Sequence, residues 1–161
     1  MSEQTNNDQF EPQSTGGGTT MSDADGILEV EQAKEFAKRI GSSLLGDKCE
    51  HVVILDVTKT SPVTGFIVIG SGTSARQMRS ALENLDDVAA EFDTSVYQIS
   101  NDNDALWLLA DFVDVVVHVF EPNARSHYDL ESMWIGAPRI EVPPFTPPAR
   151  PSNDGTGEGS A

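Results

Sequence analysis

The chain has little cysteine: Cys49 stands alone among 161 residues. One cysteine cannot form an internal disulfide or a zinc framework, so the composition fits a reducing compartment such as the cytoplasm. Cys49 lies just before an apolar run at 51–57, which favours a small buried or half-buried residue over a nucleophile. No apolar run reaches the roughly 18 residues that a membrane-spanning helix needs.

Positive charge is also scarce, because 10 Lys and Arg stand against 26 Asp and Glu, for a net charge of −16. Clustered Lys and Arg form the electrostatic footprint of nucleic-acid-binding proteins, so we expect no direct DNA contact. The same charge disfavours an anionic membrane surface. Solubility and attraction of a basic protein partner both remain as explanations of the acidity.

Two terminal segments lack the apolar residues of a core. Residues 1–28 contain no Lys or Arg and are rich in small polar residues, which predicts a disordered tail. The same segment lacks the Arg content of an organellar presequence and the apolar region of a secretion signal. Residues 138–161 hold six of the nine prolines, which predicts a disordered extended tail, either solvated or docked in a groove. Residues 29–137 should form one domain, with 8 basic and 18 acidic residues and hence a charge of −10.

Hydrophobic periodicity predicts an α/β fold with a mixed β-sheet of about five strands and flanking helices. The expected helices are 30–44, a long helix from Thr73 or Ser74 to 92, and 125–134. The expected strands are 51–57, 66–70, 96–100, 107–111 and 114–120, with a polar turn at 101–104 and a bend at Phe112 and Val113.

The glycine-containing turn at 70–74 joins a predicted buried strand to a helix N-terminus, a geometry that can bind an anion. It matches neither the phosphate-loop nor the Rossmann pattern. The order of strand, Gly-Ser and helix is similar to the nucleotidyltransferase fold, but Asp86 and Asp87 are adjacent near the helix end instead of forming D-x-D on a strand. A tight turn with a capping hydroxyl is favoured, and a nucleotidyltransferase-type enzyme is the alternative function.

Asp111, Asp114 and His118 are candidate ligands or acid–base residues because they interrupt an apolar stretch. In an extended strand Asp114 and His118 share a face but lie about 13 Å apart, too far for one metal ion to bridge. Asp111 and Asp114 fall on opposite faces unless the chain turns, and a third ligand would have to come from His51 or His127. A histidine satisfied by hydrogen bonds at a sheet face is therefore favoured over a metal ligand or general base.

Both tryptophans and one of the two tyrosines lie in the same stretch, at Trp107, Tyr128 and Trp134. Large aromatic side chains beside acidic residues are typical anchors of protein-docking surfaces. Trp134 alone is better explained as closing the core, whereas the position of Trp107 at a strand start favours docking.

Several blocks resemble the ribosomal silencing factor family, also called Iojap-related proteins, over roughly 29–136. The blocks are Asp56-Val57 with Lys59 and Ser61, FIVIGSGTSARQM at 66–78, WLLADFVDVVVHVF at 107–120, and Arg125, Tyr128, Leu130, Glu131 and Trp134. Three positions depart from the family: Gly65 replaces an aspartate, Ser100-Asn101 a Glu-Gly pair, and Val113 a glycine between the two aspartates. These departures concern local turn geometry more than the fold.

The resemblance implies a nucleotidyltransferase-like fold without catalytic carboxylates, and a function that is not enzymatic. Family members bind the fourteenth protein of the large ribosomal subunit and block joining of the small subunit when nutrients are scarce. An acidic domain suits such a basic partner. We therefore expect a cytoplasmic translation repressor with no cofactor and no metal, and the sequence leaves open whether the free chain forms a homodimer.

The aromatic and acidic side chains of 107–131 are the candidates for this partner-binding surface. Trp107 is expected to be an apolar anchor, with Asp111, Asp114 and Glu131 facing basic residues of the partner. His118 and Tyr128 should support this surface, and Arg76 should tie the neighbouring helix to it.

Overall fold

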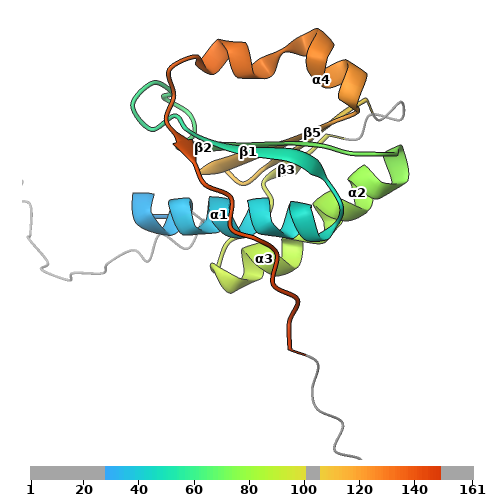
Figure 1. Cartoon of the computed structure of the whole chain (residues 1–161). Coiled ribbons are helices and arrows are strands. Elements are labelled where there is room, and N and C mark those ends of the chain that lie inside the picture. Colours follow the sequence, from blue (N-terminus) through green and yellow to red (C-terminus); the bar gives the residue numbers. More distant parts are fainter. Residues whose placement is uncertain (1–27, 101–105, 150–161) are drawn as a thin grey trace, which may run out of the picture.

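A six-stranded mixed sheet organises the protein, in a computed structural model that describes residues 28–100 and 106–149 (Figure 1). The strands are β1 Glu50–Asp56, β2 Phe66–Ser71, β3 Gln98–Ile99, β4 Trp107–Asp111, β5 Val115–Phe120 and β6 Arg139–Ile140. The helices are α1 Val30–Gly46, α2 Ala75–Glu83, α3 Leu85–Glu91 and α4 Pro122–Tyr128, followed by the 3₁₀ helix η1 Leu130–Trp134.

The strands lie in the order β3-β4-β5-β2-β1-β6. β2 and β5 pair in parallel, and all other neighbours are antiparallel. The predicted α/β fold with a mixed sheet of about five strands is thus confirmed, and the sheet has six. The sixth is β6, a two-residue edge strand that the prediction had placed in a tail.

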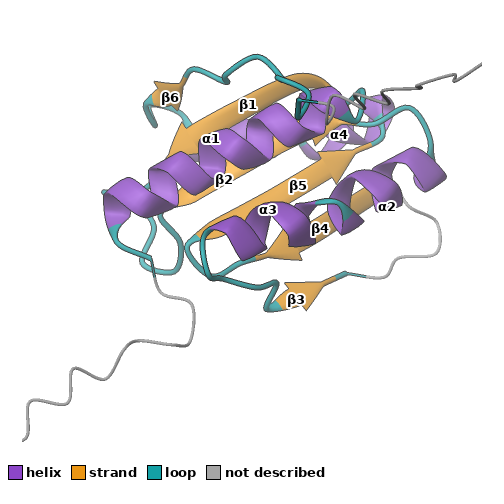
Figure 2. Ribbon diagram, turned by 90° about the horizontal axis from the view of Figure 1, so that it is seen from below, coloured by secondary structure: helices purple, strands orange, loops and turns teal. Residues whose placement is uncertain are grey.

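One face of the sheet carries α1, α2 and α3 (Figure 2). The larger core lies between these layers, where Phe36 packs against Phe92 and Phe112 with ring centroids 5.2 and 5.3 Å apart. Every residue of β2 is buried, because the opposite face of this central strand is covered as well. A continuous apolar strand such as FIVIG is the pattern that burial on both faces requires.

The other face is covered in part by α4 and η1 (Figure 1). A smaller core forms here, from Ala124 of α4 and apolar residues of the central strands, with Leu130 and Trp134 packed against it. Trp134 therefore lies against the core, as the sequence indicated.

Two predicted helices are each divided in the structure. The predicted helix from Ser74 to 92 breaks at Asn84, and Ser74 is the N-cap because its hydroxyl accepts a hydrogen bond from the Gln77 amide at 3.1 Å. The predicted helix 125–134 breaks at Asp129, whose φ of 45° ends α4 in the left-handed region.

The proline-rich segment after η1 packs onto the domain. Pro138 accepts a hydrogen bond from the Asp56 amide through its carbonyl, and the hydroxyl of Ser42 in α1 donates to the Pro144 carbonyl at 3.2 Å. Phe145 lies so close to Gly46 that a Cβ there would meet its ring at 2.5 Å. The domain thus extends past the predicted boundary at 137, while the predicted turn at 101–104, residues 1–27 and residues 150–161 lie outside the described residues.

Candidate partner-binding site

The side of the sheet that faces α4 carries a cluster of aromatic rings on β4, β5 and α4. Trp107 stacks on Phe120 with centroids 4.9 Å apart and an interplanar angle of 26°. Tyr128 lies 5.0 Å from Trp107 and is 52% exposed. The structure therefore brings together three residues singled out from the sequence, since His118 also lies 5.8 Å from the Trp107 ring.

A hydrogen bond joins two of these rings. The indole Nε1 of Trp107 donates to Nδ1 of His118 at 3.0 Å. His118 is 7% exposed, and its burial lowers the pKa of the imidazole to about 4. The imidazole is thus neutral at physiological pH and can accept the hydrogen bond, so the expected histidine satisfied at a sheet face is the arrangement observed.

The surface continues along β4 and includes residues that were not predicted from the sequence. Strand alternation places Trp107, Leu109 and Asp111 on one side, and each is half-buried, whereas the intervening residues are buried against the helices. Leu109 pairs with His118 across the strands, and Asp111 pairs with Val116. The alternation in WLLAD was the available signal. We call the set Trp107, Leu109, Val116, His118, Phe120 and Tyr128 the aromatic face.

The two aspartates do not lie together. Asp111 borders the aromatic face, and its Oδ1 accepts a hydrogen bond from the Val113 amide at 2.7 Å. Asp114 lies six residues from Phe120, which is about 20 Å along an extended strand. Its carboxylate accepts a hydrogen bond from the Leu28 amide at 2.8 Å, and burial raises the pKa of the carboxyl. Asp114 thus fixes the chain before α1 and lies at the end of β5 opposite Phe120.

Glu131 and Arg76, two further residues that were predicted to support the partner-binding surface, are not part of the aromatic face. Glu131 forms an ion pair with Arg125 at 2.8 Å and lies 3.6 Å from Arg139. Arg125 also donates to the His51 carbonyl and the Ser71 hydroxyl, so this network ties α4 and η1 to the sheet. Arg76 is exposed in the first turn of α2.

The turn at 70–74 is filled by side chains of its own helix. The Thr73 amide donates to the side-chain oxygen of Gln77 at 2.8 Å, and the Gln77 amide donates to Ser74. A Cβ at Gly72 would collide with Met78. The helix N-terminus on which nucleotide binding would depend is therefore capped internally, as the favoured tight-turn interpretation requires. Asp86 and Asp87 lie in the first turn of α3 and not on a strand.

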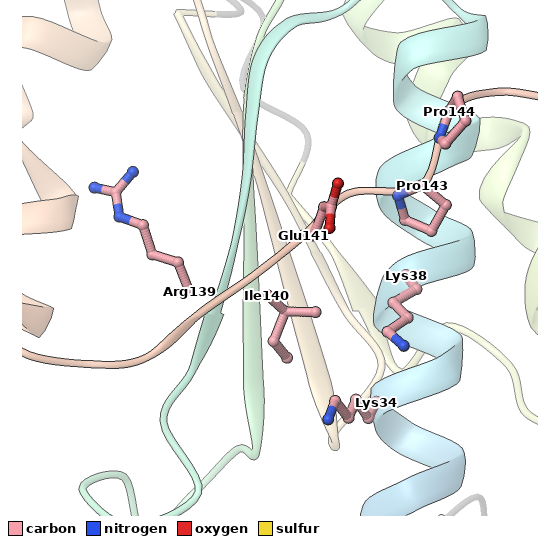
Figure 3. Close-up of a pocket in the computed structure, with 7 residues that line it drawn as sticks. All are labelled: Lys34, Lys38, Arg139, Ile140, Glu141, Pro143 and Pro144. Carbon is pink, nitrogen blue, oxygen red and sulfur yellow. The ribbon is translucent and has the colours of Figure 1, made fainter.

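A groove of about 480 Å³ lies between α1 and the C-terminal segment (Figure 3). Lys34 and Lys38 reach into it, whereas Arg139 points away from both (Figure 3). Lys38 pairs with Glu35 at 3.1 Å, and Glu141 also lines the groove. Its positive charges are thus dispersed and partly balanced, which makes it a poor anion site.

Cys49 is buried, and desolvation raises the pKa of its thiol to about 11. It therefore stays protonated, as expected for a residue that is not a nucleophile. Within 28–100 and 106–149, no three or more His, Cys, Asp or Glu residues are grouped so that they could hold a metal ion. In the same ranges, no helix is both long and apolar enough to cross a membrane.

These features define a class: a small α/β domain with an ordered aromatic surface beside a partly covered sheet. The chain matches the family model described as "Ribosomal silencing factor during starvation" over residues 30–160, and it belongs to this family. The match extends past the expected limit of the resemblance at 136.

Similarity to individual proteins supports this assignment. The chain is 36% identical over 95 residues to ribosomal silencing factor RsfS of Halalkalibacterium halodurans, covering 59% of this chain and 81% of the relative. It is 30% identical to mouse "Mitochondrial assembly of ribosomal large subunit protein 1", covering 58% of this chain and 42% of that protein. A crystal structure from Chromobacterium violaceum superimposes with a TM-score of 0.59 at 25% identity, covering 76% of this chain and 96% of that one.

Proposed function

We propose that the protein represses translation in the cytoplasm by binding the large ribosomal subunit and sterically blocking joining of the small subunit. The fourteenth large-subunit protein is the proposed contact. Membership of the ribosomal silencing factor family supports a ribosomal target, and the name of the mouse relative refers to the large subunit.

The observation that carries the proposal is the aromatic face. Trp107 and Tyr128 are large, partly exposed and held by neighbouring rings, which are the properties of anchor residues in protein interfaces. Leu109 and Val116 extend the apolar area, and Asp111 lies at its border. Exposed apolar patches of this kind mark interaction surfaces more often than they mark folding defects.

Charge supports the same partner. The net charge of −16 repels ribosomal RNA, so productive contact would require a basic protein surface on the large subunit. Charge complementarity of this kind mainly accelerates encounter, while the apolar anchor supplies affinity.

Two arms of one sedimentation experiment test the proposal. The full chain should co-sediment with isolated large subunits and not with joined ribosomes. When it is added to large subunits before small subunits, the fraction of joined ribosomes should fall in proportion to the bound chain. Binding to joined ribosomes, or unchanged joining at saturation, contradicts the steric block. Calorimetry with the isolated fourteenth protein then tests the direct contact.

A further inference from the structure

The hydrogen-bond donor of Trp107 is used inside the protein. Its Nε1–H group donates to His118, while its ring packs against both Phe120 and Tyr128. Exposed tryptophan anchors often donate this N–H to a partner, because the indole has an apolar body and one polar atom. Here only the ring surface remains for a partner.

We propose that His118 is a positioning residue for Trp107. Its Nδ1 atom accepts the hydrogen bond of the indole N–H and thereby holds the indole in the orientation that binds the partner. The partner therefore contacts Trp107 through its apolar ring alone. This inference rests on the proposed function, since the binding event is the docking described above.

The location of His118 suits this role. It lies on β5, between β4 and β2, and its Cα pairs with Leu109 on one side and Ile69 on the other. A residue in the middle of a sheet has little freedom, so its acceptor atom has a fixed position. His118 is 7% exposed and therefore acts on the partner only through Trp107.

The consequence for recognition is both entropic and chemical. Immobilising a large side chain on binding costs affinity, and an indole that is already held avoids that cost. A partner group over Trp107 then needs no hydrogen-bond acceptor. Aliphatic groups, including the stems of lysine and arginine side chains, satisfy this condition.

Nuclear magnetic resonance tests the hydrogen bond without a partner. In the full chain carrying Trp134→Phe, Trp107 gives the only indole N–H signal, because the sequence has two tryptophans. His118→Phe keeps an aromatic ring but removes the acceptor, and should shift that signal upfield and accelerate its exchange with solvent. His118→Asn places an amide oxygen near the Nδ1 position and should restore both properties. His118→Val is the second variant without an acceptor if His118→Phe does not fold.

Affinity for large subunits tests the consequence. Loss of the acceptor should weaken binding about tenfold, with His118→Asn recovering most of it. In a Trp107→Phe background the same His118→Phe change should alter affinity by less than about twofold, because the two residues act as one unit.

Three results would overturn the proposal. Folded acceptor-free variants that bind as well as the parent show that the contact does not prepare the anchor. An equal loss in the Trp107→Phe background shows that His118 acts through the fold and not through Trp107. An indole signal that is unchanged in the acceptor-free variants shows that Trp107 does not donate a hydrogen bond to His118. Failure of the parent to bind large subunits instead contradicts the proposed function. The indole signal then still shows whether Trp107 and His118 form the hydrogen bond.

Discussion

The two faces of the sheet bury their aromatic residues in different ways. On the helical face Phe36 and Phe112 are 0% and 2% exposed and belong to the larger apolar core. On the face toward α4, Trp107 is half-buried and Tyr128 is more than half exposed, although both are held by neighbouring rings. Ordered rings that remain exposed to solvent contribute less buried apolar area to folding, so their arrangement indicates selection for binding. The comparison predicts that stability depends mainly on the first face and affinity on the second.

Phe36→Ala should have the largest effect on stability. Removal of a fully buried phenylalanine should lower the free energy of unfolding by about 3–5 kcal/mol, because the cavity cannot collapse against Phe92 and Phe112. Urea denaturation followed by circular dichroism measures the change. A loss below about 1 kcal/mol would mean that the helical face is not the main core.

Acid should destabilise the protein through the aromatic face. His118 has a folded pKa of about 4 against 6.5 when unfolded, so the unfolded state binds a proton first as pH falls. Its contribution is complete above about pH 6.5 and declines toward pH 4, by at most about 3 kcal/mol.

Urea midpoints measured from pH 7 to pH 4 provide the test of this titration. Parent and His118→Asn share every other titrating group, so the parent curve should fall more steeply. Parallel curves would show that His118 is not neutral and buried in the folded state.

Val113→Gly should stabilise the turn between β4 and β5. Val113 has φ of 72°, a conformation that disfavours a β-branched residue and that glycine adopts freely. The gain should be about 1 kcal/mol, the net of relieved strain and added chain entropy. Thermal unfolding measures it, with Val63→Gly in the exposed loop as the matched control. A variant less stable than the parent would contradict the strain.

Arg39→Ala should have the smallest effect. Arg39 makes bidentate hydrogen bonds to the Glu91 carboxylate, but both side chains are about half exposed, at 48% and 53%. Solvent screening should limit the loss to less than about 0.5 kcal/mol. Urea denaturation checks this value, and large-subunit affinity should equal that of the parent. A tenfold loss of affinity would place the binding surface on the helical layer.

Local patterns predicted β1, β2, β4, β5 and the first helix because their apolar residues follow simple periods. FIVIG and HVVILDV are short β-branched runs, and the bend at Phe112 and Val113 lies where β4 ends and β5 begins. The breaks at Asn84 and Asp129 escaped prediction, since neither residue forbids a helix. β6 was missed because its pairing with β1 joins residues about 85 positions apart in a proline-rich segment, and no local period reports such a contact.

The site was only partly predictable for a similar reason. Trp107, His118 and Tyr128 were selected by residue type. The β4–β5 hairpin register brings Trp107 and His118 together, and α4 adds Tyr128. Leu109 and Val116 look like ordinary strand residues until the uneven cover of the sheet by α4 leaves them half-exposed. Asp114 was assigned to a partner because its intramolecular partner, the Leu28 amide, is 86 residues away in the sequence. Glu131 was assigned by its charge, and the ion pair with Arg125 follows from the turn between α4 and η1.

The most direct test of the proposed binding surface compares an aromatic residue of the aromatic face with one outside it. Tyr97 lies just before the edge strand β3, is 75% exposed and is not part of the aromatic face. Affinity for isolated large subunits is measured for Trp107→Ala, Tyr97→Ala and the parent, each shown to be folded. We expect Trp107→Ala to weaken binding by about 30-fold or more and Tyr97→Ala to bind like the parent. Equal affinities for all three proteins, or a loss confined to Tyr97→Ala, would contradict it.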